Sequence, residues 1–443
     1  MVRGISSINT GLGVKTHYGN FNYGGLATSA KDAVKDLSSR HSKEGQFLKW
    51  VSLPKKQIKR VDYIYDLVNK FKNQSPAKFL TVIGIGGSKH PVEHMLRING
   101  LNLDNKVKFI SDIDSTSHNI FMHTIGNDIR NSNYLIVSKS GSTFEPQDAF
   151  VRTQKLMKES FENDGYNANE SEKMTSKHFV AVTDKSSKSQ LRQTANEQNW
   201  LGKLFIHDDV GGRFSSFDDH TLFSLAYAGM KKEDMIKLLE GADGMSKVAL
   251  SKDLTKNDPL AQAAFWVQAK FRGIQTSVHQ YLGSMFENTV NWHSQMQNES
   301  IKDTLKQIAK IPDAMHHSSE AHFNKDNRYV YALTSPTDNG ILAENLEGYS
   351  KAMGKTYSSF GSFFNEVVET QGLGLKPEAA GAMTQSRGFA TVYQGLMERD
   401  LSGIEYPKDK PIPEVIQDNV EQYKKNLKPD ANGNNVVEAG RIR

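Results

Sequence analysis

Apolar residues recur along this chain with two different periods, and the change of period marks its organisation. Between residues 54 and 71 they return every three or four positions, which predicts one helix with a single buried face. From residue 79 short apolar runs alternate with helical segments, a pattern typical of a parallel sheet covered on both faces. The expected strands are 79–85, 107–110, 134–137, 178–183 and 203–206, and the expected helices between them are 92–98, 117–125, 146–159 and 187–196.

The rest of the chain shows weaker patterns. Residues 1–50 predict an arm with one helix at 29–37, and the polar segment 163–177 predicts a surface loop. After residue 215 the chain is expected to be mostly helical to about residue 272. A second alternating region follows, with strands expected at 277–282, 328–334 and 356–360 and helices at 286–296, 341–353 and 380–397. A last helix is expected at 414–427.

These two alternating regions predict two α/β subdomains, and a chain of 443 residues is long enough for both. The boundary between the sheets is expected between residues 215 and 275. The expected division is an N-terminal arm (1–53), a first subdomain (54–215), a helical connector with the second subdomain (216–412), and a C-terminal helix and tail (413–443).

Composition excludes several kinds of site. The chain has no cysteine, which excludes disulfides, thiolate nucleophiles and zinc–cysteine sites. No apolar run approaches the length of a membrane span and residues 1–14 lack the core of a signal peptide, so we expect a cytoplasmic protein without a membrane partner. A net charge of +5 with both signs interspersed argues against a nucleic-acid partner.

Two polar turns follow expected strands, at the sheet edge where parallel sheets bind ligands. Segment 138–143, Ser-Lys-Ser-Gly-Ser-Thr, lies between a buried strand and a helix start. Its hydroxyls, lysine, backbone N–H groups and helix N-terminus favour a phosphate. Segment 84–88, Gly-Ile-Gly-Gly-Ser, is a second such turn. Lys89 occupies the place of the third glycine of a dinucleotide fingerprint, so a nucleotide site is not expected, and an ordinary βα turn is the alternative for each segment.

Three further segments carry side chains that could act on such a ligand. Arg213 follows two glycines and suits an oxyanion, although a lone arginine is more often an ion-pair residue. Gln295 and Glu299 share a helix face, and Glu299 is either a proton-transfer group or an ordinary helix carboxylate. His316 and His317 are adjacent and do not share a helix face, so one could act as an acid–base group but a paired metal site is not expected.

Together with one more segment, these pieces resemble the glucose-6-phosphate isomerase (phosphoglucose isomerase) family. The added segment is 420–424, which alone would predict a lysine-rich, solvated helix face. The matching segments in chain order are 84–88, 138–143, Gly-Gly-Arg-Phe-Ser at 211–215, Gln295 with Glu299 and Ser300, and Val-Glu-x-x-Lys at 420–424. The resemblance covers roughly residues 79–428. It implies two sugar-isomerase (SIS) subdomains, each a mostly parallel sheet sandwiched by helices, with N- and C-terminal helical arms.

The resemblance also implies a role for each matching residue. Glu299 would move a proton between C2 and C1 of the sugar, Arg213 would stabilise the enediolate, and Lys424 would lie by the ring oxygen. A histidine at 316 or 317, with His317 preferred, would help to open the ring. Gln295 would bind substrate. The residues implied to hold the 6-phosphate are Ser88, Ser138, Lys139, Ser140 and Thr143.

The activity implied by the resemblance is interconversion of glucose 6-phosphate and fructose 6-phosphate through an enediolate, in glycolysis and gluconeogenesis. Neither a cofactor nor a metal is implied. In this family the ring-opening histidine comes from the neighbouring subunit, so a homodimer with a shared active site is implied. Two alternatives stay open, a dual glucose/mannose-6-phosphate isomerase and a non-enzymatic sugar-phosphate sensor with the same fold.

Overall fold

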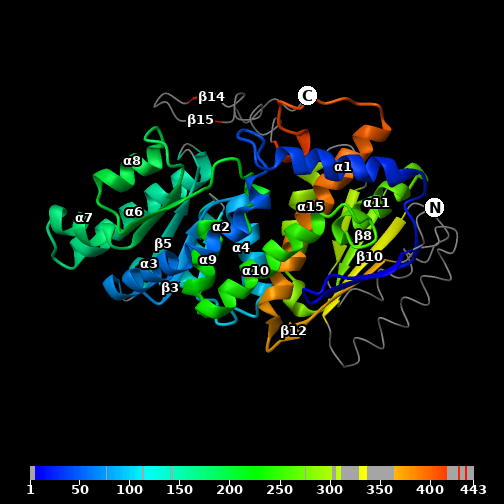
Figure 1. The fold of residues 1–443 in the computed structure, drawn as a ribbon. Helices are drawn as coiled ribbons and strands as arrows, with labels where there is room; N and C mark the ends of the chain where they lie inside the picture. Colours follow the sequence, from blue (N-terminus) through cyan, green and yellow to red (C-terminus); the bar gives the residue numbers. More distant parts are fainter. Residues whose placement is uncertain are drawn as a thin grey trace.

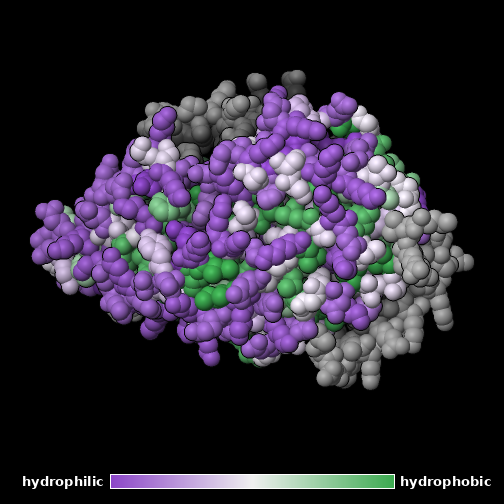
Figure 2. Space-filling model, viewed as in Figure 1, coloured by the Kyte–Doolittle hydropathy of each residue, from purple (hydrophilic) through white to green (hydrophobic). Residues whose placement is uncertain are grey.

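Two sheets, with helices around and between them, organise the molecule (Figure 1). The structure is a computed structural model, and it describes residues 5–75, 77–111, 114–139, 141, 143–274, 276–301, 306–310, 329–336, 364–416, 428–429 and 435–436. The face of the molecule in Figure 2 is mostly hydrophilic, with smaller hydrophobic areas on it.

The first sheet is wholly parallel and has the strand order β4-β3-β5-β6-β7. Its strands are β3 (Phe79–Ile83), β4 (Val107–Ile110), β5 (Ser132–Val137), β6 (Phe179–Thr183) and β7 (Gly202–Phe205). Successive residues of β5 point to opposite faces: Leu135 and Val137 join one hydrophobic core, and Tyr134 and Ile136 join the other. Both faces are therefore buried, as the continuous apolar run of this strand predicts.

Helices cover both faces of this sheet and connect its strands (Figure 1). They are α3 (Val61–Gln74), α4 (His90–Ile98), α5 (Ser115–Thr124), α6 (Phe144–Asn163), α7 (Ala168–Ser176), α8 (Gln190–Glu197) and α9 (Asp219–Tyr227). The short 3-10 helix η4 (Ile129–Asn131) directly precedes β5, whereas η1 (Gly24–Leu26) and η2 (Lys49–Val51) come before the first strand of this sheet in the chain.

The second sheet is mixed, with the strand order β1-β2-β11-β10-β8-β9. Its parallel part is β11 (Phe364–Val368), β10 (Tyr329–Pro336), β8 (Thr276–Tyr281) and β9 (Lys306–Lys310). The antiparallel hairpin β1 (Ile5–Asn9) and β2 (Val14–Phe21) continues the sheet beyond β11. Two pairs of short strands lie outside both sheets: β12 (Thr370–Gln371) with β13 (Gly374–Leu375), and β14 (Lys428–Pro429) with β15 (Asn435–Val436). The expected fold class, two mostly parallel sheets flanked by helices, is confirmed.

Long helices join the two sheets. Figure 1 shows α9, α10 (Lys232–Ala249) and α15 (Pro377–Leu401) between them. A Cβ on Gly241 would lie 2.0 Å from the carbonyl oxygen of Glu378, and one on Gly381 would lie 1.9 Å from that of Leu238. Only glycine permits α10 and α15 to approach this closely, so the junction is tightly packed. The remaining helices are α1 (Ala27–Arg40), α2 (Leu53–Ile58), α11 (Asp258–Phe271) and α12 (Thr289–Ser300).

Several local predictions need correction. The single helix expected at 54–71 is two helices, α2 and α3, with a turn at Arg60. There the side chain of Arg60 forms an ion pair with Asp219 at 2.6 Å. The expected loop 163–177 contains α7, which begins with a capping box formed by Asn167 and Glu170.

The expected N-terminal arm contains its helix, as α1, but also strands β1 and β2, which were not predicted. Strands β9 and β11 were missed as well. The last helix, expected from residue 414, does not begin there, because η8 (Pro413–Val415) is a 3-10 turn. The rest of that range, 417–427, and the expected elements at 341–353 and 356–360 lie outside the described residues. The expected domain boundaries stay a prediction.

Candidate active site

The glycine-rich loop after β3 is the meeting point of the candidate site. A Cβ on Gly84 would lie 3.3 Å from the carbonyl oxygen of Val137, at the end of β5. Gly86 has a φ of +51°, and a Cβ on it would lie 3.0 Å from Nε2 of Gln295. A Cβ on Gly87 would lie only 2.3 Å from the backbone of Gly212. The loop, which includes η3 (Gly86–Ser88), therefore packs against three other segments of the site.

Arg213 is fully buried beside this loop, within η5 (Gly212–Phe214). Its Nε donates to the hydroxyl of Ser300 at 2.8 Å, and its Nη2 donates to the carbonyl oxygen of Glu414 at 2.7 Å. Its Nη1 faces the carboxylate of Glu299 at 3.4 Å. Burial lowers the pKa of Arg213 to about 10, with Glu299 and Glu414 opposing that shift. The side chain is therefore a fixed cation at neutral pH.

Gln295 and Glu299 lie one turn apart on the last part of α12, as their spacing predicts. The amide of Gln295 donates to one oxygen of Glu299 at 2.8 Å, while the other oxygen faces Arg213. The Glu299 side chain keeps 29% of its surface exposed, so a ligand can reach it. The buried Oε1 of Gln295 has no hydrogen-bond partner among the described residues, which leaves one acceptor available beside the carboxylate.

The turn after β5 is a tight turn that leads directly into a helix N-terminus. The N–H of Gly141 donates to the hydroxyl of Ser138 at 3.1 Å. Gly141 has a φ of +79°, and a Cβ there would lie 2.5 Å from the backbone of Leu191, so the turn requires glycine. Thr143 is the N-cap residue of the 20-residue helix α6 and makes no side-chain capping bond. Lys139 is exposed, and its Nζ lies 5.8 Å from the ring centroid of Phe47.

The structure thus brings together Ser88, Arg213, Gln295 and Glu299 around one loop, and it places Ser138, Lys139 and Thr143 at the end of the neighbouring strand. Four expected site residues lie outside the described part of the chain: Ser140, His316, His317 and Lys424. Sequence reasoning missed the contact of Glu414 with Arg213, since that glutamate was expected in a helix and no local pattern signals its tertiary partner.

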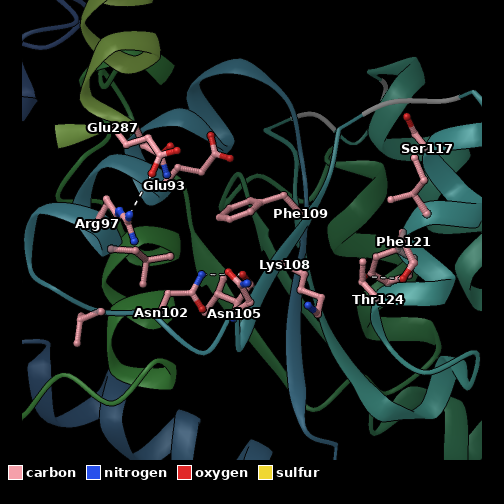
Figure 3. A pocket seen from close by; sticks show the side chains of 15 residues that line it. Glu93, Arg97, Asn102, Asn105, Lys108, Phe109, Ser117, Phe121, Thr124 and Glu287 are labelled. Carbon is pink, nitrogen blue, oxygen red and sulfur yellow. Dashed lines mark hydrogen bonds and ion pairs between the residues drawn. The ribbon is translucent and has the colours of Figure 1, made fainter. Parts of the chain in front are cut away.

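A cavity of about 540 Å³ lies apart from these residues, at the edge strand β4 (Figure 3). Side chains of α4, β4 and α5 line it, together with Glu287 and Asn288 before α12. In Figure 3 Arg97 faces Glu287, and these two form an ion pair at 3.0 Å. None of the lining residues is an expected site residue.

One group of side chains could in principle hold a metal. Ligand atoms of His207, Asp218 and Asp219 lie within 4.8 Å of one another. Asp219, however, forms an ion pair with Arg60 and accepts the N–H of Phe205 at 3.1 Å. Asp218 accepts from Nδ1 of His207 at 2.5 Å. These carboxylates already accept bonds from cations and N–H donors, so the group is better described as an ion-pair network than as a metal site.

Among the described residues, no helix has both the length and the apolar character required to cross a membrane.

Comparison with known proteins gives a consistent set of relatives. Those named glucose-6-phosphate isomerase include one from Mycoplasmopsis pulmonis, 31% identical over 281 residues, which are 61% of this chain and 61% of the relative. Another, from Clostridioides difficile, is 34% identical over 235 residues, 49% of this chain and 48% of the relative. A third, from Limosilactobacillus reuteri, is 26% identical over 363 residues, 75% of each chain. The chain thus spans less than two thirds of the length of the first two.

Solved structures show the same fold. A glucose-6-phosphate isomerase from Chlamydia trachomatis aligns with a TM-score of 0.72 at 17% identity, covering 95% of this chain and 88% of that chain. A hypothetical protein from Thermus thermophilus aligns with a TM-score of 0.71 at 19% identity, covering 91% of this chain and 94% of that chain. The family model described as phosphoglucose isomerase matches residues 70–320. Because this match spans more than half of the sequence, the chain belongs to the phosphoglucose isomerase family.

Proposed function

We propose that this protein is an aldose–ketose isomerase that interconverts glucose 6-phosphate and fructose 6-phosphate. The observation that carries the proposal is the arrangement of Glu299 between Gln295 and Arg213, at 2.8 and 3.4 Å. A partly exposed carboxylate next to a buried, permanent cation suits a reaction in which a carbon-bound proton leaves and an oxyanion forms. Relatives named glucose-6-phosphate isomerase support the same activity.

In the proposed mechanism Glu299 takes the proton from C2 of the open-chain aldose. The electron pair of that bond forms the C1–C2 double bond, and the oxygen on C1 becomes an enediolate oxygen. Arg213 stabilises this negative charge from a fixed position, without reorganisation. Glu299 then gives the proton to C1, and the hydroxyl proton of C2 passes to the oxygen on C1, which yields the ketose. The unpaired Oε1 of Gln295 can accept a hydrogen bond from a sugar hydroxyl.

The 6-phosphate is proposed to bind at the turns after β3 and β5, through Ser88, Ser138, Lys139, Ser140 and Thr143. The N-terminus of α6, which begins directly after Thr143, favours an anion there. Phosphate binding away from the reacting carbons supplies energy that positions them. A histidine at 316 or 317, with His317 preferred, is proposed to open the ring, with Lys424 at the ring oxygen.

The proposal implies an enzyme of glycolysis and gluconeogenesis that works in the cytoplasm without cofactor or metal. It is tested by a coupled assay with fructose 6-phosphate in the presence of EDTA. We expect turnover by the wild type and a loss of about 10³-fold in kcat for Glu299→Gln, with sugar-phosphate binding retained in calorimetry. Glu287→Gln, an exposed glutamate just before the same helix, is the control and should behave as wild type.

Other outcomes of that assay separate the remaining functions. Turnover that requires a metal contradicts the mechanism, and turnover that survives Glu299→Gln shows that another group is the base. Binding of fructose 6-phosphate without turnover by the wild type favours the sensor. Comparable turnover of mannose 6-phosphate favours the dual isomerase.

A further inference from the structure

The position of Arg213 depends on a segment far from it in the sequence. Its Nη2 donates to the carbonyl oxygens of Glu414 at 2.7 Å and Ile416 at 3.3 Å, which are 201 and 203 positions further along the chain. These oxygens belong to η8 and the residue after it. A shift of η8 would therefore remove the acceptors of one of the three guanidinium nitrogens.

The side chain of Glu414 holds η8 together with the buried Ile412 and Val415. It is buried, and its Oε1 accepts from Nε of Arg399 at 2.6 Å. Arg399 lies near the end of α15, one turn after Gly395. A Cβ on Gly395 would lie 2.2 Å from Cγ and 2.7 Å from Oε1 of Glu414. The helix thus leaves room for the carboxylate at Gly395 and binds it with Arg399, both on the same helix face.

The contact between Glu414 and Arg399 is electrostatic as well as steric. Burial raises the pKa of Glu414, and Arg399 opposes that shift. Glu414 in turn raises the pKa of Arg213, against the effect of burial. Among the described residues, Glu299 on α12 is a further charged group that faces Arg213, and Glu398 on α15 is one that faces Glu414. Glu398 is itself paired with Lys270 at 2.9 Å.

We propose that Glu414, held by Arg399 against Gly395, is a positioning residue that fixes the Arg213 guanidinium where the enediolate charge develops. This inference rests on the proposed function, because it assigns the isomerase a residue outside the groups that touch substrate. Truncating the side chain of Glu414 or Arg399 would leave the Arg213 side chain itself unchanged. It would loosen the carbonyl groups of η8 that orient the guanidinium. The transition state then loses stabilisation, while the phosphate turns after β3 and β5 are unaffected.

The test is Glu414→Gln, which keeps the size of the side chain and removes its charge. We expect kcat for fructose 6-phosphate to fall about tenfold, equivalent to about 1.4 kcal/mol, with KM changed less than about twofold. The alkaline limb of the kcat profile should move to lower pH, because Arg213 loses a nearby anion. Arg399→Met should reproduce the fall in kcat but not the shift of the alkaline limb, because it keeps the Glu414 carboxylate. Arg399→Lys should restore part of the lost kcat, and the double variant Glu414→Gln/Arg399→Met should have a kcat no lower than either single variant.

The control is Asp128→Asn, which breaks the ion pair of Asp128 with Arg130 at 3.0 Å, before the start of β5. That pair makes no contact with Arg213, so kcat and the alkaline limb should stay at the wild-type values. If Glu414→Gln lowers only the melting temperature, with kcat and the alkaline limb unchanged, Glu414 is a structural anchor and the inference is overturned. If Glu414→Gln does not fold, a wild-type kcat in Arg399→Met overturns it.

A second readout separates this inference from the proposed function. It is the affinity for an enediolate mimic, a sugar phosphate that carries a hydroxamate at C1. If the wild type shows no turnover, the proposed function fails, but an affinity about tenfold weaker in Glu414→Gln still supports the positioning role. Equal affinity of both proteins, or no binding by the wild type, overturns it.

Discussion

The guanidinium of Arg213 is held by acceptors from two different elements, and this determines what it can do. Ser300 and Glu299 on α12 take two of its nitrogens, and main-chain oxygens around η8 take the third. Such a planar group with fixed partners can stabilise an oxyanion only in one place, and a point charge on a flexible stem cannot replace it. The identity of this residue, and not only its charge, should therefore matter.

Arg213→Lys tests that point. The charge is kept, but Nε and one of the two Nη donors are lost, so the bonds to Ser300 and Glu414 cannot both form. We expect kcat to fall about 10²-fold with little change in KM, in the range seen when one oxyanion donor is removed. Arg97→Lys, in an exposed ion pair with Glu287, is the control and should keep wild-type kcat. Wild-type kcat in Arg213→Lys would show that only a positive charge is needed.

At the scale of elements, the sequence predicts what local patterns encode. The strand ends and polar turns of the first sheet follow from apolar runs, and the loop 84–88 lies where its glycines suggest. Strand β1 was missed because its two buried positions do not alternate. Strand β2 alternates, with Val14, Thr16 and Tyr18 buried, but its partner β11 lies far away in the sequence and the alternation was overlooked. Glu414 was missed for a similar reason, since its partners Arg399 and Arg213 come from other elements.

Gly87→Ala tests the packing of the site loop against η5. The new Cβ would lie 2.3 Å from the backbone of Gly212, so either loop must move, and Arg213 directly follows Gly212. We expect a loss of about 1–3 kcal/mol in the free energy of unfolding, as for overpacking elsewhere, together with lower kcat. Gly25→Ala is the matched control, because a Cβ there meets nothing within 4 Å. Equal stability and activity of the two variants would mean that the loops are not in contact.

His94 makes the stability of the helical layer depend on pH. It is buried between α4, α12 and α15, bonded to Thr289 and Thr384 at 3.0 Å each and stacked on Trp292. Burial lowers the pKa of His94 to about 3. Below pH 6.5 His94 therefore binds a proton in the unfolded chain but stays neutral in the folded one. The free energy of unfolding that is present above pH 6.5 is lost as the pH falls toward 3.

Urea unfolding between about pH 7.5 and about pH 4.5 measures this effect. His94 alone should cost about 2–3 kcal/mol by about pH 4.5. In His94→Gln the slope of unfolding free energy against pH should be shallower by close to one proton. Leu96→Ala, a buried residue of the same helix, should lower stability at every pH but leave the slope unchanged. An unchanged slope in His94→Gln would mean that His94 is already protonated in the folded state.

On the scale of the whole molecule, the site draws on both sheets. The turns proposed to bind phosphate and Arg213 follow strands of the first sheet, whereas Gln295 and Glu299 lie on α12, which follows β8 of the second. The junction of α10 with α15, closed at Gly241 and Gly381, fixes the two sheets relative to each other. One chain thereby positions the proposed base, a buried cation and the turn proposed to bind phosphate. The ring-opening histidine, expected at 316 or 317, is the group that the proposed dimer would supply from the neighbouring subunit.

Subunit mixing decides whether the site is shared. Glu299→Gln and His317→Ala should each be inactive alone, because each removes one required group from every site. In a heterodimer of the two, one site carries both defects and the other carries neither. Random reassortment of a 1:1 mixture makes half of the dimers mixed, so about one quarter of wild-type activity should return, as expected for a two-fold symmetric assembly. No recovery, in a mixture shown by mass spectrometry to have exchanged subunits, would mean that each chain supplies its own histidine, and recovery with His316→Ala in place of His317→Ala would move the role to His316.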